Sequence, residues 1–133
     1  DEGEVWEAFH FAYAHKLDNI IYFIDKNGYQ LDGSTQDILD HGDIAAKAAA
    51  FGLHTQEIDG HDVKAIYDAI QTALAHRGVP SCIVLDTIKG NGCRLAMETF
   101  PCHHLKFKPE QIAPSVIEAE QVLAKAREAL EVR

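Results

Sequence analysis

The sequence lacks any apolar run that approaches the roughly 20 residues a membrane-spanning helix requires. It also lacks a signal-peptide pattern. Cysteine is sparse: Cys82, Cys93 and Cys102 form an odd set without paired spacing, so reduced thiols in the cytoplasm are expected. The first residue is Asp1 rather than methionine, in what reads as the middle of an element, and we expect further residues upstream.

Basic residues are also scarce relative to acidic ones. Lys and Arg number 12 against 21 Asp and Glu, which gives a formal net charge of −9. This balance argues against a nucleic-acid partner or an anionic membrane surface. A phosphorylated ligand is still compatible with it, because backbone N–H groups and a metal ion can bind phosphate locally. The length of 133 residues and the 47% hydrophobic content fit one globular domain.

Short β-rich apolar runs alternate with patterns typical of helices. The predicted strands are Asn19–Asp25, His54–Ile58 and Ser81–Ile88. The predicted helices are Glu4–His15, one from an Asp43 cap through Ala50, one from an Asp62 cap to Gly78, and one from Pro114 onward. The third of these helices has its predicted apolar face at Val63, Ile66, Tyr67, Ile70 and Leu74. The last carries Val116, Ile117, Glu120, Leu123, Ala124 and Leu130.

The alternation predicts an α/β fold with a parallel sheet flanked by helices. In such sheets ligands bind beyond the carboxyl ends of the strands. The loop after Asp25, the turn after Ile58 and the loop after Ile88 are therefore expected to approach one site. The segments 29–40 and 89–109 are predicted to be irregular.

Two loops offer groups for a charged ligand. The loop from Asp25 to Gly33 contains carboxylates, an amide and exposed backbone carbonyls, which suit a hard cation such as Mg²⁺, although Asn27-Gly28 is also a common turn signal. The loop Lys89–Gly92 has backbone N–H groups that suit phosphate, but it lacks the context of a dinucleotide-binding fingerprint and also reads as a plain turn.

Histidines suggest a third possibility. Cys93, Cys102, His103 and His104 do not match the spacing of a structural zinc site. The adjacent histidines are better interpreted as a proton shuttle or a phosphate contact. The other six histidines are expected to be structural or exposed, with His61, just beyond the second strand, as the one of most interest.

The order of several short motifs resembles the transketolase family along nearly the whole chain. The matching strings are Glu2-Gly3-Glu4-Val5-Trp6-Glu7-Ala8, Lys16-Leu17-Asp18-Asn19-Ile20-Ile21, Asp25 to Gly33, Ala50-Phe51-Gly52, Ile58 to Asp62, Thr87 to Gly92, Met97-Glu98 and Pro101-Cys102-His103. The separately encoded N-terminal subunits of that family are the most similar. The resemblance implies the thiamin-diphosphate-binding fold, with residues 1–133 as the C-terminal portion of the diphosphate-binding domain.

The resemblance also implies a set of site residues. Those at the cofactor would be Glu2, Asn27, Leu31, Gly90 and His103. The Asn27 side chain and the Tyr29 backbone carbonyl would be ligands of Mg²⁺ or Ca²⁺. His103 would contact diphosphate and substrate and act as the catalytic residue in proton transfer, although His104 stands where a glycine is usual. Glu2 would couple two cofactor sites across a dimer interface.

The reaction implied is transfer of a two-carbon ketol unit between sugar phosphates, with thiamin diphosphate as the cofactor. The family's Gly-Asp-Gly aspartate would lie before Asp1, and the glutamate that activates the cofactor belongs to a pyrimidine-binding C-terminal subunit. We therefore expect the chain to work in a homo- or hetero-oligomer and to be inactive alone. Two alternatives are the E1 component of a 2-oxoacid dehydrogenase and a non-catalytic α/β binding module.

Overall fold

The structure, a computed structural model, describes residues 2–99, 103–104 and 106–131, and it divides into two compact units, residues 1–87 and 88–133. The first unit contains α1 (Glu4–Ala14), β1 (Ile21–Lys26), β2 (Tyr29–Gln30), β3 (Gly33–Ser34), α2 (Thr35–Ile38), α3 (Ile44–Ala50), β4 (His54–Asp59), α4 (Val63–Ala75) and β5 (Ser81–Asp86). The second contains α5 (Arg94–Glu98) and α6 (Pro109–Glu131). None of the helices in the described part of the chain has the length and hydropathy to span a bilayer.

The main sheet is parallel, as the alternation of elements predicts. Its strand order is β1-β5-β4, and β5 pairs with both neighbours over its full length. Because β5 is central and covered on both faces, it needs apolar or small side chains throughout, and residues 81–84 are all buried. The predicted strand at residues 81–88 is therefore confirmed, with its regular part ending at Asp86.

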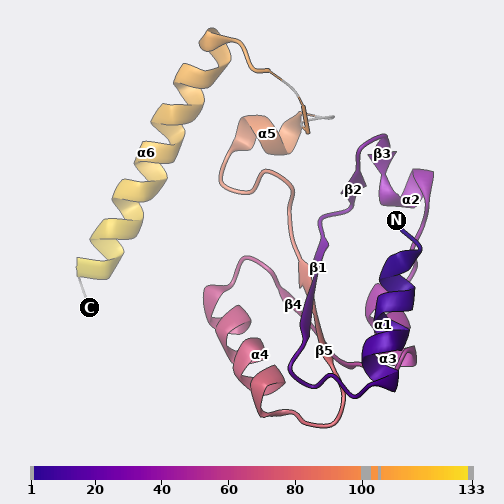
Figure 1. The fold of residues 1–133 in the computed structure, drawn as a ribbon. Coiled ribbons are helices and arrows are strands. Elements are labelled where there is room, and N and C mark those ends of the chain that lie inside the picture. Colours follow the sequence, from indigo (N-terminus) through magenta and orange to yellow (C-terminus); the bar gives the residue numbers. More distant parts are fainter. Residues whose placement is uncertain (1, 100–102, 105, 132–133) are drawn as a thin grey trace. The chain divides into compact units, whose positions relative to one another are not determined.

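Helices cover both faces of this sheet (Figure 1). On one face, Phe9 of α1 and Ala48 of α3 pack with Cys82 and Val84 of β5. On the other face, α4 packs with its buried residues against Ile83. The first unit is thus a three-layer α/β/α arrangement in which the alternating side chains of β5 serve two separate cores.

Cys82 belongs to the first of these cores. The residue is fully buried, and burial raises the pKa of its thiol to about 11. The thiol is therefore protonated and unreactive at neutral pH, because the thiolate is the nucleophilic form. Cys82 acts as a small apolar core residue in the described fold.

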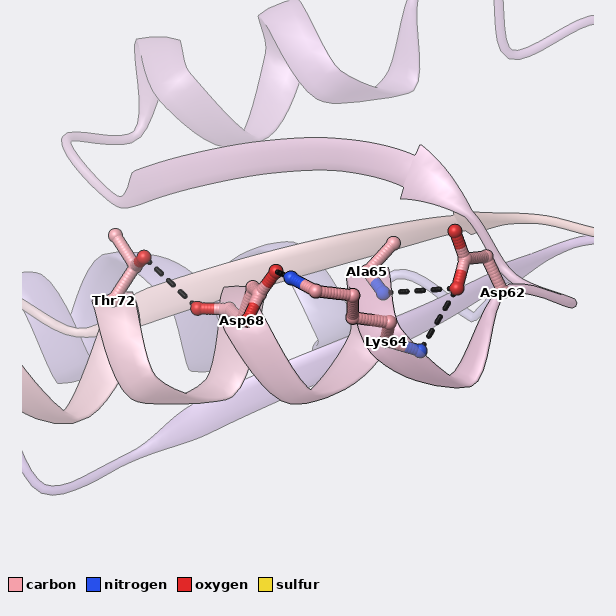
Figure 2. A network of polar contacts seen from close by, with 5 residues as sticks. All are labelled: Asp62, Lys64, Ala65, Asp68 and Thr72. Carbon is pink, nitrogen blue, oxygen red and sulfur yellow. Dashed lines mark hydrogen bonds and ion pairs between the residues drawn. The ribbon is translucent and has the colours of Figure 1, made fainter. Parts of the chain in front are cut away.

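Aspartate side chains cap the N-termini of α3 and α4. Asp43 accepts a hydrogen bond from the Ala46 N–H at 2.8 Å and thereby begins α3. Figure 2 shows the same device at α4, where the Asp62 carboxylate accepts from the N–H groups of Lys64 and Ala65 at 2.8 and 3.2 Å. One turn later the Lys64 ammonium pairs with Asp68 at 2.5 Å. Both predicted caps are confirmed, and each satisfies N–H groups of the first helical turn.

The buried face of α4 agrees only in part with the predicted one. Ile66 and Ile70 are half-buried, and Ile70 packs against the core. Ala69 and Ala73 are fully buried, whereas Val63, Tyr67 and Leu74 are exposed. The small alanines let the helix approach the sheet closely, and the Gln56 side chain donates to the Ala69 carbonyl at 3.0 Å. Apolar periodicity predicted that the large side chains of α4 face the sheet. The helix instead packs closely on the sheet through its small residues, Ala69 and Ala73.

Both segments predicted to be irregular contain regular structure. In residues 29–40, β2 and β3 form a short antiparallel hairpin, and the Ser34 hydroxyl caps α2 by accepting from the Asp37 N–H at 3.1 Å. In residues 89–109, α5 forms at Arg94–Glu98. The last helix, α6, begins at Pro109 and contains Pro114. The prediction that this helix begins at Pro114 was wrong by five residues. Proline suits the first helical position, and here Pro109 rather than Pro114 occupies it.

Candidate functional site

The three parallel strands end together at one edge of the sheet. Lys26, Asp59 and Asp86 are register partners at the last positions of β1, β4 and β5. Backbone hydrogen bonds extend this alignment into the loops, from the Gly60 N–H to the Asp86 carbonyl at 2.9 Å and from the Thr87 N–H to the Lys26 carbonyl at 3.4 Å. The predicted convergence is confirmed for the loop after β1 and the turn after β4. The loop after Ile88 belongs to the second unit, and its approach to this edge stays a prediction.

Asn27 lies just beyond β1 and is held by hydrogen bonds on both sides of its amide. Its Nδ2 donates to Asp25 Oδ2 at 2.8 Å, and its Oδ1 accepts from the Tyr29 backbone N–H at 2.9 Å. The other carboxylate oxygen of Asp25 accepts a hydrogen bond from the Thr87 hydroxyl. These contacts fix the orientation of the Asn27 side chain and join the ends of β1 and β5.

A cleft of about 300 Å³ opens beside Asn27 in the first unit. The residues that line it are Ile24, Asp25, Lys26, Asn27, Gly28, Tyr29, Thr35, Asp40, His41, Gly42, Ile44, Asp86 and Thr87. Its polar lining is dominated by carboxylate, amide and hydroxyl oxygens. Such a wall suits a hard cation that also binds the oxygens of a phosphorylated ligand.

The donor set fits Mg²⁺ or Ca²⁺ better than a transition metal. The Asn27 amide oxygen uses one lone pair for the Tyr29 N–H and has a second that suits a metal bond. Among the residues that the structure describes, no group of three or more His, Cys, Asp or Glu side chains is arranged to hold a metal ion. A cation held here would therefore depend on ligand phosphate oxygens for much of its coordination, which is usual for Mg²⁺.

Lys26 brings a positive charge to the same edge. Its ammonium pairs with Glu57 Oε1 at 2.7 Å, and this hydrogen bond is the main reason that the pKa of Lys26 is raised. Glu57 belongs to β4, so the pair bridges the two outer strands of the sheet across β5. Both side chains are substantially exposed, and the pair contributes little to stability.

The other predicted residues of the first unit lie in different settings. Tyr29 is exposed in β2, Leu31 is 60% exposed in the turn of the hairpin, and Glu2 is exposed just before α1. His61 follows β4, where its backbone N–H donates to Asp59 Oδ1 at 2.8 Å. The structure therefore places Asn27 and Tyr29 on one cleft, whereas Leu31 and Glu2 are not among the residues that line it. The roles assigned to them stay predictions.

Gly90 and His103 belong to the second unit. Gly90 has φ +79°, and a Cβ atom at this position would lie 2.8 Å from the Ala96 Cβ, so the turn before α5 requires glycine. His103 and His104 are exposed, and their ring centroids are 4.5 Å apart. Their predicted contacts with a cofactor are not tested, and Cys102 lies outside the described residues.

Thr87, Asp40 and His41 are among the cleft residues to which sequence reasoning assigned no role. Thr87 anchors Asp25, while Asp40 and His41 come from the segment before α3. Thr87 had a detectable signal, because it directly follows the third strand of a parallel sheet. Asp40 and His41 had none, because they reach the cleft only through the fold of the hairpin and α2.

Comparison with known proteins agrees with this geometry. The family model "Transketolase, thiamine diphosphate binding domain" matches residues 1–119. The chain is 40% identical over 121 residues to the 6-deoxy-6-sulfo-D-fructose transketolase subunit SqwG of Clostridium sp. (strain MSTE9), an alignment that covers 91% of this chain and 44% of that protein. It is 34% identical to an apulose-4-phosphate transketolase subunit of Actinobacillus succinogenes, with 84% of this chain and 40% of the relative covered.

The fold is shared with solved transketolases. A transketolase variant from Pichia stipitis in complex with fructose 6-phosphate superposes with a TM-score of 0.65 and 34% identity, over 70% of this chain and 14% of the other. The chain spans less than half the length of the two curated relatives above. With a parallel sheet flanked by helices and a family model that matches 119 of its residues, the chain belongs to the transketolase family, within its thiamine diphosphate binding domain.

Proposed function

We propose that this chain is the C-terminal portion of the diphosphate-binding domain in the N-terminal subunit of a two-chain transketolase. The reaction would be transfer of a two-carbon ketol unit between sugar phosphates. The observation that carries the proposal is the Asn27 amide, fixed by Asp25 and the Tyr29 backbone at the carboxyl edge of a parallel sheet. This is the edge where α/β folds bind phosphorylated ligands.

The chain's own residues would hold and orient the cofactor. Asn27 Oδ1 and the Tyr29 carbonyl would bind the Mg²⁺ or Ca²⁺ ion that neutralises the diphosphate. Asp25 and Thr87 would keep the Asn27 amide in its orientation, as their hydrogen bonds do in the structure. Thiamin diphosphate, when bound, supplies the carbanion chemistry, which the side chains of the protein lack.

The remaining roles follow from the family resemblance. Leu31 would line the cofactor pocket, Gly90 would allow backbone to lie close to the cofactor, and His103 would contact diphosphate and substrate and move a proton. Glu2 would couple two cofactor sites. The exposure of Leu31, His103 and Glu2 supports these roles, because each side chain is accessible to a ligand or a partner.

Two relatives suggest the substrate class and the partner. Their names describe subunits of transketolases that act on a sulfonated ketose and on a ketose phosphate. We propose that the donor is an anionic ketose and that the partner is a pyrimidine-binding C-terminal subunit, in a homo- or hetero-oligomer. A cytoplasmic location belongs to the same proposal, because three cysteines without paired spacing are typical of a reducing compartment.

The test is ketol transfer by the natural subunit together with its C-terminal partner, with thiamin diphosphate and Mg²⁺ present. We expect xylulose 5-phosphate, or a related anionic ketose, to donate two carbons to an aldose phosphate. Omission of either subunit is expected to abolish turnover. Calorimetry of the complex with thiamin diphosphate, with and without Mg²⁺, measures binding separately from the reaction.

Two results would contradict the proposal in different ways. Oxidative turnover of pyruvate without ketol transfer would indicate a 2-oxoacid dehydrogenase component. Absence of thiamin diphosphate binding by the complete complex would indicate a non-catalytic module that keeps the α/β scaffold.

A further inference from the structure

The sequence contains two Asn-Gly pairs, Asn27-Gly28 and Asn91-Gly92. Such pairs are prone to deamidation, because glycine has no Cβ to hinder its backbone nitrogen from attacking the preceding side chain. The nitrogen loses its proton and bonds to the asparagine Cγ, the Cγ–Nδ2 bond breaks, and ammonia leaves with the proton. Water then opens the resulting succinimide ring and yields aspartate or isoaspartate.

The glycine of the first pair is required by the fold. Gly28 has φ +76°, a left-handed conformation that residues with a Cβ rarely adopt. Its carbonyl accepts a hydrogen bond from the Thr35 N–H at 2.9 Å, which joins the loop to the start of α2. A larger residue at this position would slow deamidation but would strain the turn. The rate of deamidation at Asn27 consequently depends on the contacts that surround it.

Hydrogen bonds hold both ends of the Asn27 amide. Its Nδ2 donates to Asp25 Oδ2 at 2.8 Å, and its Oδ1 accepts from the Tyr29 N–H at 2.9 Å. The Thr87 hydroxyl donates to Asp25 Oδ1 and so fixes the carboxylate. Attack by the Gly28 nitrogen draws Cγ toward the main chain and expels Nδ2. The hydrogen bond from Nδ2 to Asp25 must break first, so the reaction requires a locally opened state.

The main chain on both sides of the pair is held as well. The Lys26 carbonyl accepts from the Thr87 N–H at 3.4 Å, and the Gly28 carbonyl accepts from the Thr35 N–H. Closure of the succinimide ring needs a rotation about the Cα–C bond of Asn27, which turns these two carbonyls relative to each other. All of these contacts are made inside the first unit, so its fold is sufficient to form them.

The second pair has a similar backbone but lacks the side-chain contacts. Gly92 has φ +88°, and the Asn91 N–H donates to the Ile88 carbonyl at 3.0 Å. The Asn91 side chain makes no hydrogen bond to the part of the chain that the structure describes. The two pairs therefore compare an amide that is held with one that is not.

We propose that the hydrogen bond to Asp25 protects Asn27 from deamidation. Without this protection, a new carboxylate would form next to Asp25, and isoaspartate would also insert a methylene into the main chain beside the cleft. The metal ligand would then be lost, a consequence that rests on the proposed function. The protection itself rests only on the contacts of the Asn27 amide in the structure.

Incubation of the natural, full-length subunit in mildly alkaline buffer, without added cofactor or metal, tests the proposal. Peptide mass spectrometry measures the conversion of Asn27 and of Asn91 separately, and an isoaspartate assay confirms the product. In the folded wild type, Asn27 is expected to react at least about tenfold more slowly than in the same protein unfolded in urea. A hydrogen bond to a charged group reduces the opened population by at least that factor.

Aspartate variants identify the protecting group. Asp25→Ala is expected to raise the rate at Asn27 at least about tenfold, because the charged acceptor of Nδ2 is lost. The matched control is Asp32→Ala, which removes an exposed carboxylate from the same loop and should leave the rate unchanged. The isosteric Asp25→Asn keeps an acceptor oxygen without its charge, and its rate should lie between those of wild type and Asp25→Ala. It tests the same hydrogen bond if the alanine variant does not fold.

Three results would overturn the proposal. Equal rates at Asn27 in folded and in urea-unfolded wild type would mean that the fold gives no protection. Equal rates in the Asp25 variants and in Asp32→Ala would mean that Asp25 is not its source. A parallel increase at Asn91 in both Asp25 variants would trace the effect to general unfolding. All three are measured as peptide masses, whereas failure of the proposed function would appear as a complex whose activity does not change when Asn27 is converted.

Discussion

The two ends of the parallel sheet are built from the same three strands but use polar groups in opposite ways. At the carboxyl end, Asp25, Asn27 and Thr87 bind one another and line an open cleft. At the amino end, polar side chains are buried between the strands and α4. Ser81 is 1% exposed, and its hydroxyl has no hydrogen-bond partner among the described residues.

A pair of stacked histidines completes the amino end. The His54 and His76 rings lie nearly parallel with centroids 4.0 Å apart, and they join the start of β4 to the end of α4. His54 faces Ser81 in the strand register, and its Nδ1 is buried without a partner among the described residues. Burial, and secondarily the neighbouring His76, lower the pKa of His54.

This difference suggests that polar groups at the carboxyl end of the sheet serve ligand binding, whereas those at the amino end serve stability. Groups at the carboxyl end hold one another in a fixed orientation toward a cleft, so their loss should affect ligand binding more than folding. Groups at the amino end have little access to a ligand, so their loss should affect folding alone. Substitutions at matched positions at the two ends can test this division.

The largest effect is expected for Asn27→Ala. Loss of the amide removes a predicted metal ligand, and we expect transketolase activity of the complete complex to fall about 100-fold. Thermal stability should change by less than about 0.5 kcal/mol, because the residue is only half-buried in a loop. The measurement is kcat/KM as a function of Mg²⁺ and thiamin diphosphate concentration.

The matched control for that variant is Asn19→Ala. Asn19 precedes β1 at the amino end, whereas Asn27 follows it at the carboxyl end. Activity is expected to be unchanged in this control. Equal loss of activity in the two variants, or a loss that saturating Mg²⁺ and cofactor do not reduce in Asn27→Ala, would contradict the assigned role.

A smaller effect is expected for Thr87→Val. The shape of the side chain is kept, but the hydroxyl that holds Asp25 is lost, and the Asn27 amide gains freedom to rotate. We expect about a tenfold loss of cofactor affinity with little change in stability. Thr87→Ser retains the hydroxyl and should restore affinity. If Ser and Val variants bind the cofactor equally well, Thr87 does not position Asn27.

The sequence predicted the sheet and its edge well because both follow from local signals. The apolar run from Ser81 and the Asp43 and Asp62 caps are each readable from a few neighbouring residues. The strand ends predicted at Asp25 and Ile58 lie one residue before the observed ends of β1 and β4. The cleft was predicted only in part. Asp40 and His41 reach it through the β2–β3 hairpin, and no local pattern encodes that path.

The packing face of α4 shows the same limit. Its large apolar residues indicate a stripe, but Ala69 and Ala73 make the contact with the sheet because they allow a shorter separation. For Gly90 and His103, the residue types suggested only a phosphate-binding turn and a proton shuttle or phosphate contact, and the specific roles at a cofactor came from the family resemblance. Neither position has a local pattern that reveals what it would contact in another unit or chain.

The stacked histidines predict a pH dependence of stability at the amino end. Because the pKa of His54 is lower in the folded state than the ordinary value of about 6.5, the unfolded chain binds protons more readily. This contribution to stability is fully present above that ordinary value. It is lost as the pH falls from there toward and through the lowered pKa of the folded state.

We expect His54→Gln to flatten the decrease in unfolding free energy between neutral and mildly acidic pH, because the variant lacks the group whose pKa is lowered by folding. The measurement is urea unfolding at a series of pH values. His10→Gln, an exposed position on α1, is the control and should keep the wild-type dependence. A His54→Gln curve parallel to that of wild type would remove His54 as the origin of the effect.

The smallest effect is expected for Ser81→Ala, and it is an increase in stability. The buried hydroxyl makes no hydrogen bond to the described residues, so its removal relieves a desolvation cost and we expect a gain of about 0.5 kcal/mol in unfolding free energy. Ser34→Ala is the control with the opposite sign, because that hydroxyl accepts the Asp37 N–H at the start of α2. A loss of stability in Ser81→Ala that disappears in the His54→Gln background would instead show that Ser81 and His54 are hydrogen-bonded in solution. The amino end would then resemble the carboxyl end in satisfying its polar groups pairwise, and the two ends would differ only in their access to a ligand.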